Sequence, residues 1–223
     1  METSHYILFS SYLLTILFGF YTIKHSDYIG RVALSFVILS TLIDAVSIYY
    51  ASSLTNNLFY INLYEYLAFP IEISILLLTK VINKIFVVLS IFLIIGYWII
   101  HLLFNLQNGF DHFSKNLSYG SSVILCIYFG IIILLILTNH QKDFEKHKLS
   151  FLILGGIFIF ETNLSVIVLK FKLQLSPQED LFLSQTYYIT NLIATVIKNT
   201  LFTLYFIFTS QQINISLNQK NHE

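Results

Sequence analysis

Five ionisable side chains stand inside long apolar runs of this 223-residue chain, and these are the residues best placed to do chemistry. They are Asp44, Glu65, Glu72, Glu161 and Lys198. An acid or a lysine near the centre of a bilayer costs at least about 2.5–3.5 kcal/mol, so such residues usually face the protein interior or a wet cavity. Carboxyl groups and an amine in such a cavity can bind a ligand, relay protons or act as general acids and bases.

Helical spacing collects these residues into polar stripes, because residues three or four apart share one face of a helix. The stripes are Ser40, Asp44 and Ser47; Asn62, Glu65, Phe69 and Glu72; Phe158, Glu161 and Ser165; and Tyr187, Asn191, Thr195, Lys198 and Tyr205. Four stretches of the chain therefore each present one stripe, and we expect the stripes to face a common interior.

Charge and depth pair Glu72 with Lys198. At 1.5 Å per residue, both lie roughly 21–23 Å below the outer membrane face. Two interpretations remain open. The two residues could form a structural ion pair that joins two helices, or they could flank a ligand or a proton path.

The other three acids lie in the outer half of the membrane and have no matching lysine. Burial and mutual repulsion favour the neutral form of some of them. We predict an outward-opening pocket that contains Asp44, Asn62, Glu65, Glu161 and Asn191, and Glu72 and Lys198 complete the set of predicted binding residues. The alternative is that protonated carboxyl groups hydrogen-bond between helices and hold them together. No residue is assigned a catalytic or metal-ligating role.

Seven apolar runs, each long enough to cross a bilayer, must position these residues. The runs cover 6–23, 29–50, 57–78, 83–104, 118–138, 149–170 and 184–209. The chain is 56% hydrophobic and 11% charged, whereas soluble domains carry about 25% charged residues. The sequence therefore predicts an all-α integral membrane bundle of seven transmembrane helices, in one domain over residues 1–223.

The placement of lysine and arginine predicts the orientation of the bundle. The N-terminus and the loops on its side hold Lys115, Lys170 and Lys172. The opposite side holds Lys24, Arg31, Lys80, Lys84, Lys142, Lys146, Lys148 and Lys220. We therefore expect the N-terminus outside and the C-terminus in the cytoplasm. The formal net charge is zero, so no basic excess favours a nucleic-acid partner.

Familiar motifs are scarce. No HExxH, GxSxG or P-loop pattern occurs, so nothing favours a zinc protease, a serine hydrolase or a nucleotide-driven pump. Cys126 is the only cysteine, which excludes an intrachain disulfide. His101 follows Tyr97 and Trp98 near the outer end of the fourth run, and we interpret it as a surface histidine in an interfacial aromatic belt. Gly155 and Gly156 permit close helix approach, without a GxxxG dimer motif.

A lysine midway along the last of seven helices resembles the arrangement in microbial rhodopsins. That resemblance would make Lys198 a Schiff-base lysine and Glu65 or Glu72 a counter-ion. The chain departs from the family at Ala194, where the family has an aspartate four residues before its lysine. It departs again at Trp98, its sole tryptophan, because the family's tryptophans surround the retinal. We expect no retinal on Lys198 and no other cofactor.

The chain also resembles a broad group of seven-helix inner-membrane proteins of Bacteroidota, a group without an established activity. The resemblance rests on paired asparagines before an aromatic stretch that ends in hydrophobic-Glu, and on an asparagine before an aromatic run in the last helix. Here these positions are Asn56, Asn57, Phe59, Tyr60, Tyr64, Phe69, Ile71 and Glu72, and then Asn199, Phe202, Tyr205 and Phe206. It implies location in a bacterial inner (cytoplasmic) membrane.

Short loops leave the helix bundle itself, or a separate partner, to carry the function. We expect a sensing or binding module in which the outward pocket takes a small molecule, a lipid or a proton. Helix rearrangement would then pass the event to a cytoplasmic or membrane signalling partner. Two rivals remain, a membrane enzyme on lipid or isoprenoid substrates with Glu65, Glu72 and Glu161 as acid/base groups, and a proton-coupled carrier. The sequence favours a non-enzymatic role.

Overall fold

The computed structural model is all-α. It describes residues 2–52, 58–78, 84–109, 115–138, 141–170 and 177–220, and the side chains of 3–49, 63–64, 66–75, 77–78, 85, 87–109, 120–135, 137–138, 149–166, 185–186 and 188–211. The described part of the chain forms seven helices. They are α1 (Glu2–Thr22), α2 (Tyr28–Ser52), α3 (Leu58–Leu78), α4 (Lys84–Asn108), α5 (Lys115–Thr138), α6 (Gln141–Lys170) and α7 (Pro177–Lys220).

Several helix ends have a local cause in the sequence. Asp27 precedes α2, and its Oδ1 accepts the backbone N–H of Gly30 at 2.9 Å, which satisfies a donor left free at the helix start. Gly109 follows α4 with a φ of 84° and donates its N–H to the Asn105 carbonyl at 2.8 Å, a conformation that favours glycine. Pro177 opens α7, where a proline costs no hydrogen bond.

Each predicted apolar run overlaps one helix, but two helices extend well beyond their runs. α6 begins at Gln141 rather than 149, and α7 covers Pro177–Lys220 rather than 184–209. The added residues are rich in Gln, Glu and Lys, which are good helix formers and need no apolar surroundings. Hydropathy marks where a helix can lie in lipid, and not where the helix ends.

Five helices contain segments long and apolar enough to cross a membrane among the described residues. The segments are Thr3–Thr22, Tyr28–Tyr49, Val87–Asn108, Leu149–Val166 and Tyr188–Gln211. Shorter apolar segments occur in α3 (Tyr66–Ile75) and α5 (Gly120–Leu135). The chain is therefore a multi-pass helical membrane protein.

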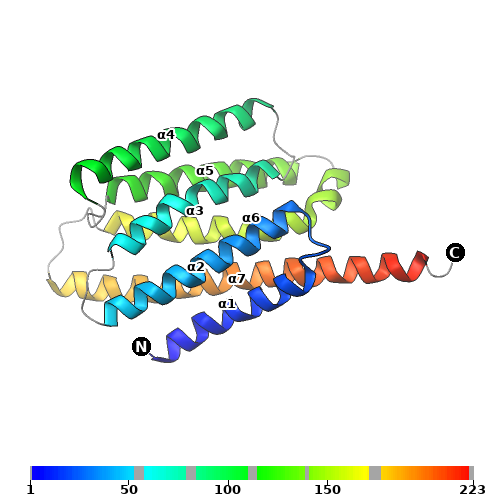
Figure 1. Ribbon diagram of the computed structural model, residues 1–223, viewed down its shortest axis with the longest axis horizontal. Helices are drawn as coiled ribbons and strands as arrows, with labels where there is room; N and C mark the ends of the chain where they lie inside the picture. The colour runs from blue at the N-terminus through cyan, green and yellow to red at the C-terminus, as the bar shows by residue number, and fades with distance from the viewer. Residues whose placement is uncertain are drawn as a thin grey trace.

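Six of the helices form a closed ring. In the order α1, α2, α3, α5, α6, α7 each helix packs on the next, and α7 packs back on α1. Only α4 lies outside the ring, at one edge of the bundle, where it packs chiefly on α3 (Figure 1). The ring is therefore closed by a direct contact between α3 and α5, although α4 lies between them in the sequence.

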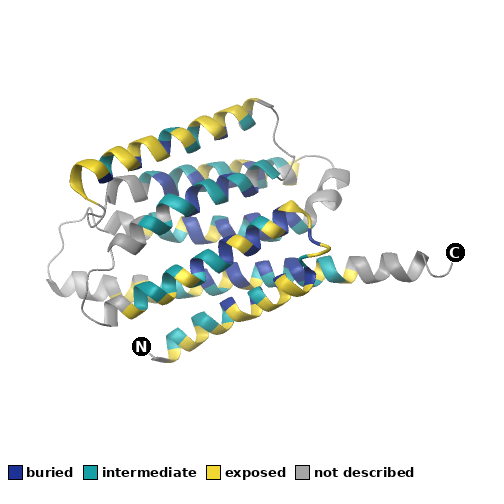
Figure 2. Ribbon diagram, viewed as in Figure 1, coloured by how far each residue is buried: buried dark blue, intermediate teal, exposed yellow. Residues whose placement is uncertain are grey.

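α4 exposes apolar side chains along most of its length (Figure 2). The exposed ones are Ile85, Val88, Leu89, Ile91, Phe92, Ile95, Trp98, Ile99, Ile100, Leu102, Leu103 and Leu106. A soluble protein could not leave such a continuous apolar face in water without association. In a bilayer the same face contacts lipid, so α4 needs no further cover from the protein.

The interior of the ring holds an apolar core and a separate polar space. Buried aromatic rings from three of its helices belong to the core, namely Phe36 of α2, Phe129 of α5, and Phe202 and Phe206 of α7. α7 runs the full height of the ring, and its last turns project past the other helices toward the C-terminus (Figure 1).

Candidate functional site: a polar cavity inside the helix ring

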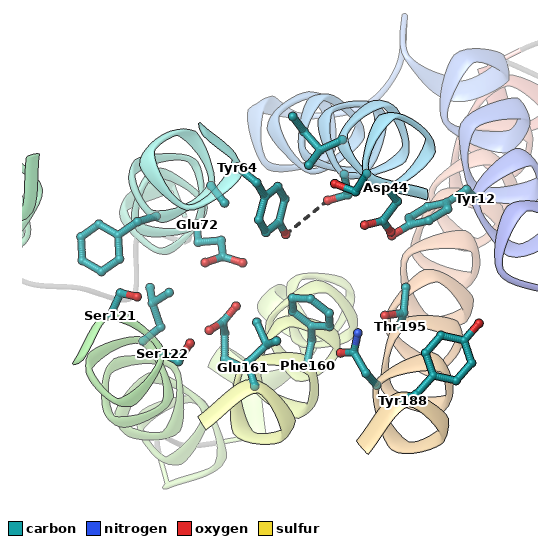
Figure 3. Close-up of a pocket in the computed structure, with 18 residues that line it drawn as sticks. Tyr12, Asp44, Tyr64, Glu72, Ser121, Ser122, Phe160, Glu161, Tyr188 and Thr195 are labelled. Atoms are coloured by element: carbon teal, nitrogen blue, oxygen red, sulfur yellow. Dashed lines mark hydrogen bonds between the residues drawn. The ribbon is translucent and has the colours of Figure 1, made fainter. Parts of the chain in front are cut away.

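A cavity of about 500 Å³ lies inside the ring, in the half nearer the N-terminus (Figure 3). All six ring helices line it, and no described residue of α4 does. Its polar lining consists of Tyr12, Ser40, Asp44, Ser47, Tyr64, Glu72, Ser121, Ser122, Glu161, Tyr188, Asn191 and Thr195. Cavities of this size hold small organic ligands.

Asp44 on α2 forms one pole of the cavity together with Tyr12 on α1. The Tyr12 hydroxyl donates a hydrogen bond to Asp44 Oδ2 at 2.6 Å, which holds the carboxyl group at the wall and ties α1 to α2. Nearby, the hydroxyl groups of Ser40 and Tyr64 lie 3.5 Å apart, which joins α2 to α3 (Figure 3).

Glu72 on α3 and Glu161 on α6 form the other pole. Their carboxyl groups point toward one another across the cavity, with Ser122 of α5 beside Glu161 (Figure 3). Both side chains are deeply buried, with 1% and 3% of their surface exposed. An ionised carboxylate is only an acceptor, so two such groups can hydrogen-bond to one another only when one of them carries a proton.

Lys198 on α7 is fully buried, with 0% of its surface exposed, but it does not line the cavity. Its Nζ lies 3.9 Å from the centroid of the Phe160 ring and 4.8 Å from that of the Phe36 ring. It has no hydrogen-bond partner among the described side chains. The aromatic faces stabilise the ammonium group by a cation–π interaction, since the ring quadrupole is negative at its face.

The direct ion pair between Glu72 and Lys198 is therefore not formed, although depth and charge sign matched. Lys198 interacts electrostatically with Glu72, Asp44 and Glu161, without contact with any one of them. The reason lies in the packing of α6 against α7, which places the Phe160 ring directly over the ammonium group. Periodicity places Lys198 on the inner face of α7 but cannot show which neighbour covers it.

Four of the seven predicted binding residues line the cavity together, namely Asp44, Glu72, Glu161 and Asn191. Asn191 Oδ1 also accepts a hydrogen bond from Asn163 Nδ2 at 3.3 Å, between α7 and α6. Lys198 lies behind the wall. Asn62 and Glu65 belong to α3, but their side chains fall outside the described ones.

The sequence interpretation missed what α1 and α5 contribute. It assigned polar stripes to four helices, whereas Tyr12 of α1 and Ser121 and Ser122 of α5 also line the cavity. The two serines follow Gly120 in a small polar patch at the outer end of the fifth apolar run, and this signal was available in the sequence. Tyr12 carries no such signal, because tyrosines are spread throughout the chain.

His101 is not a surface histidine, contrary to the prediction. Only 2% of its surface is exposed, because it lies between α4 and α3, with its ring 5.6 Å from that of Tyr66. Its Nδ1 lies 2.8 Å from the Asn105 amide nitrogen, one turn further along α4. This helix pair also holds Trp98, whose indole N–H donates to the Tyr66 carbonyl at 2.8 Å. These contacts attach α4 to the ring.

No group of His, Cys, Asp or Glu side chains among the described residues is arranged to hold a metal ion. No family model, curated protein or solved structure matches the chain. The site must therefore be interpreted from its own chemistry. It offers the buried carboxyl groups of Glu72 and Glu161, the separate carboxyl group of Asp44 with its hydrogen bond from Tyr12, and hydroxyl and amide groups between them. All of them lie inside the ring of six helices. Such a site can bind a polar molecule or a proton.

Proposed function

We propose that this protein is a sensing or binding module, in which the cavity takes a small molecule and α7 carries the response to the cytoplasmic side. The observation that carries the proposal is that a single helix, α7, both lines the cavity and extends beyond the ring. α7 places Asn191 and Thr195 in the cavity wall and then continues to Lys220, beyond the ring. With 44 residues against 21 in α1, α7 is roughly 35 Å longer at 1.5 Å per residue.

The proposal includes seven spans, with the N-terminus outside and the C-terminus in the cytoplasm of a bacterial inner membrane. The order of helices in the ring supports seven spans. α3 and α5 lie side by side in it, with α2 on one side and α6 on the other, and both α2 and α6 contain segments long enough to cross a membrane. The apolar segments of α3 and α5, Tyr66–Ile75 and Gly120–Leu135, extend only as far as the described side chains on either side of them, so their length does not argue against a span. The excess of lysine and arginine on the C-terminal side supports the orientation.

Polar contacts couple α7 to α1 along the path between cavity and cytoplasm. Thr15 donates to the Asn199 carbonyl at 3.0 Å and lies 2.9 Å from the Thr203 hydroxyl. The Asn199 amide donates to Ser11 Oγ at 2.9 Å. Hydrogen bonds of this kind have alternative partners one helical turn away, so a small shift of α7 can exchange them.

Pairs of spin labels on the cytoplasmic side test this coupling. Labels at Lys24→Cys, in the exposed turn after α1, and at Gln211→Cys, exposed on α7, report the distance between the two helices, with Cys126→Ser as background. Ser122→Phe fills the cavity from α5 and so mimics an occupant, whereas Ile127→Phe adds its bulk on the exposed face of α5.

We expect Ser122→Phe to move the mean label distance by roughly 1–2 Å, the usual scale of helix shifts. Ile127→Phe should leave the distance unchanged. Identical distance distributions in the two variants and the parent would refute the coupling between cavity and α7.

A lipid-directed enzyme is the second candidate, and it is favoured by the carboxyl groups of Glu72 and Glu161, which face one another in the cavity (Figure 3). A carboxyl pair that shares one proton can supply both an acid and a base. Incubation of the reconstituted protein with labelled membrane lipids decides between the two. Product that disappears in Glu72→Gln indicates an enzyme, whereas a sensor forms none. Proton flux into proteoliposomes that is lost in the same variant would instead indicate a carrier.

A further inference from the structure

The charged groups around the cavity are arranged asymmetrically. Three acids, Asp44, Glu72 and Glu161, line it. The nearby lysine, Lys198, lies outside the lining with its ammonium group against the ring of Phe160, which does line the cavity. The ring therefore stands between the positive charge and the open space. A molecule that enters the cavity meets carboxyl groups and aromatic rings before it meets the ammonium group.

One acceptor in the cavity has no donor. Oε1 of Glu72 has no hydrogen-bond partner among the described residues, although 99% of the side chain is buried. The side chain extends into the cavity from α3, toward Glu161 (Figure 3). Buried acceptors in folded proteins are almost always matched by a donor, so this position favours a ligand that supplies an N–H or O–H group.

The cavity lining presents acids without a basic side chain. Asp44, Glu72 and Glu161 line it, whereas no described lysine or arginine does, and Lys198 lies behind Phe160. A carboxylate without a counter-charge in a low-dielectric interior is costly, and a cation in the cavity would balance it.

The shape of the site favours an organic cation over a bare ion. Asp44 lies at one side of the cavity and the Glu72–Glu161 pair at the other, with Tyr64 between them (Figure 3). The described acids do not converge on one point as metal ligands do. The aromatic walls, including Tyr12, Tyr64 and Phe160, suit the hydrocarbon part of a ligand and attract its charge.

We infer that the cavity binds a small organic amine in its ammonium form, with an N–H group donating to Glu72 Oε1 and the hydrocarbon part against the aromatic walls. This inference rests on the proposed function, since it names the ligand class of the same cavity. The ammonium group would lie on the side of the cavity where Glu72 and Glu161 face one another, next to the unmatched acceptor.

Matched probes test the ligand class. Benzylamine and butylamine are ammonium ions at pH 7, benzyl alcohol and butanol have the same hydrocarbon parts without charge, and tetramethylammonium has the charge without an N–H group. Binding to the full-length protein in nanodiscs is measured by calorimetry and by the shift in melting temperature. The variants are Glu72→Gln, Glu161→Gln as a second cavity change, and Asp27→Asn as an acid-to-amide control outside the cavity.

We expect at least one primary amine to bind, with its alcohol and tetramethylammonium each at least roughly tenfold weaker. Glu72→Gln should weaken the amine by roughly 10- to 100-fold, as expected for the loss of a charged hydrogen bond. Asp27→Asn should leave the affinity unchanged, because asparagine also caps helices and accepts from Tyr205. Should Glu72→Gln not fold, the same loss is expected in Glu161→Gln.

Equal binding of amine and alcohol overturns the inference, and so does full amine affinity in both cavity variants or no amine binding at all. The spin-label experiment uses no ligand, so its outcome is independent. A label shift in Ser122→Phe without amine binding refutes only the ligand class. No label shift refutes the coupling even if amines bind.

Discussion

Two adjacent glycines in α6 allow one sharp test of how α6 packs on α7. A Cβ added at Gly156 would lie 3.1 Å from Phe202 Cε1 and 3.3 Å from the backbone oxygen of Lys198. A Cβ added at Gly155 would meet nothing within 4 Å. The two alanine variants therefore make the same chemical change, and only one of them presses on α7 beside the buried lysine.

The magnitude follows from two opposing effects. Overpacking of a tight contact costs about 1–3 kcal/mol, because the Lys198 backbone cannot move aside as a flexible side chain would. Replacement of glycine by alanine within a helix returns up to about 1 kcal/mol, and both variants share this gain. We therefore expect Gly156→Ala to be less stable than Gly155→Ala by about 1–3 kcal/mol.

Thermal unfolding in dodecylmaltoside, followed by circular dichroism, measures the difference. For a chain of this size 1 kcal/mol corresponds to roughly 2–4 °C, so the melting temperature of Gly156→Ala should be lower by about 2–12 °C. Equal melting temperatures, or a lower value for Gly155→Ala, would show that α6 does not meet α7 through Gly156. The position of Lys198 against Phe160 would then lose its support.

Three further substitutions test other contacts of the bundle by the same melting assay. Thr15→Val removes a hydroxyl between α1 and α7 and should cost about 1 kcal/mol, whereas Thr200→Val, on the exposed face, should have no effect because its hydroxyl bonds only within α7. Tyr205→Phe removes the 2.5 Å hydrogen bond to Asp27 and should cost about 1–2 kcal/mol. Trp98→Phe removes the donor to the α3 carbonyl and should cost about 1 kcal/mol. No loss in Thr15→Val, or an equal loss in its Thr200 control, would argue against the α1–α7 contact. Unchanged melting in either aromatic variant would contradict the contact that it removes.

Composition and periodicity were sufficient for the helical membrane architecture. A soluble protein could not cover so many long apolar runs with so few charged residues. In lipid, the backbone N–H and C=O groups must form their hydrogen bonds within helices. The runs therefore predicted where helices lie. Periodicity also placed Ser40, Asp44 and Ser47 on one face of α2, and all three line the cavity. A polar face needs a polar interior whatever its neighbours are, so this inference required no knowledge of the packing.

The order of the helices around the ring was not available in the same way. Nothing in the chain says that α3 packs on α5 and leaves α4 outside, since sequential helices are the default neighbours. One hint was present. The middle of the fourth run contains no acid or lysine, which suits a helix that faces lipid on most sides. The prediction for His101 was wrong because the fourth run ends at 104, which leaves out Asn105, the partner of His101 one turn further along α4.

Contacts between distant segments decided the character of the site. Tyr12 and Asp44 form a hydrogen bond between two helices, and Glu72 and Glu161 face one another across the cavity (Figure 3). Phe160 covers Lys198 because α6 and α7 approach closely at Gly156. Hydropathy and spacing act within one helix and predict which side of it avoids lipid. They cannot predict which carboxyl group finds a hydroxyl, which finds a second carboxyl, or that an aromatic ring rather than an acid would cover the lysine. Those outcomes depend on how neighbouring side chains interlock, and that is a property of the assembled helices.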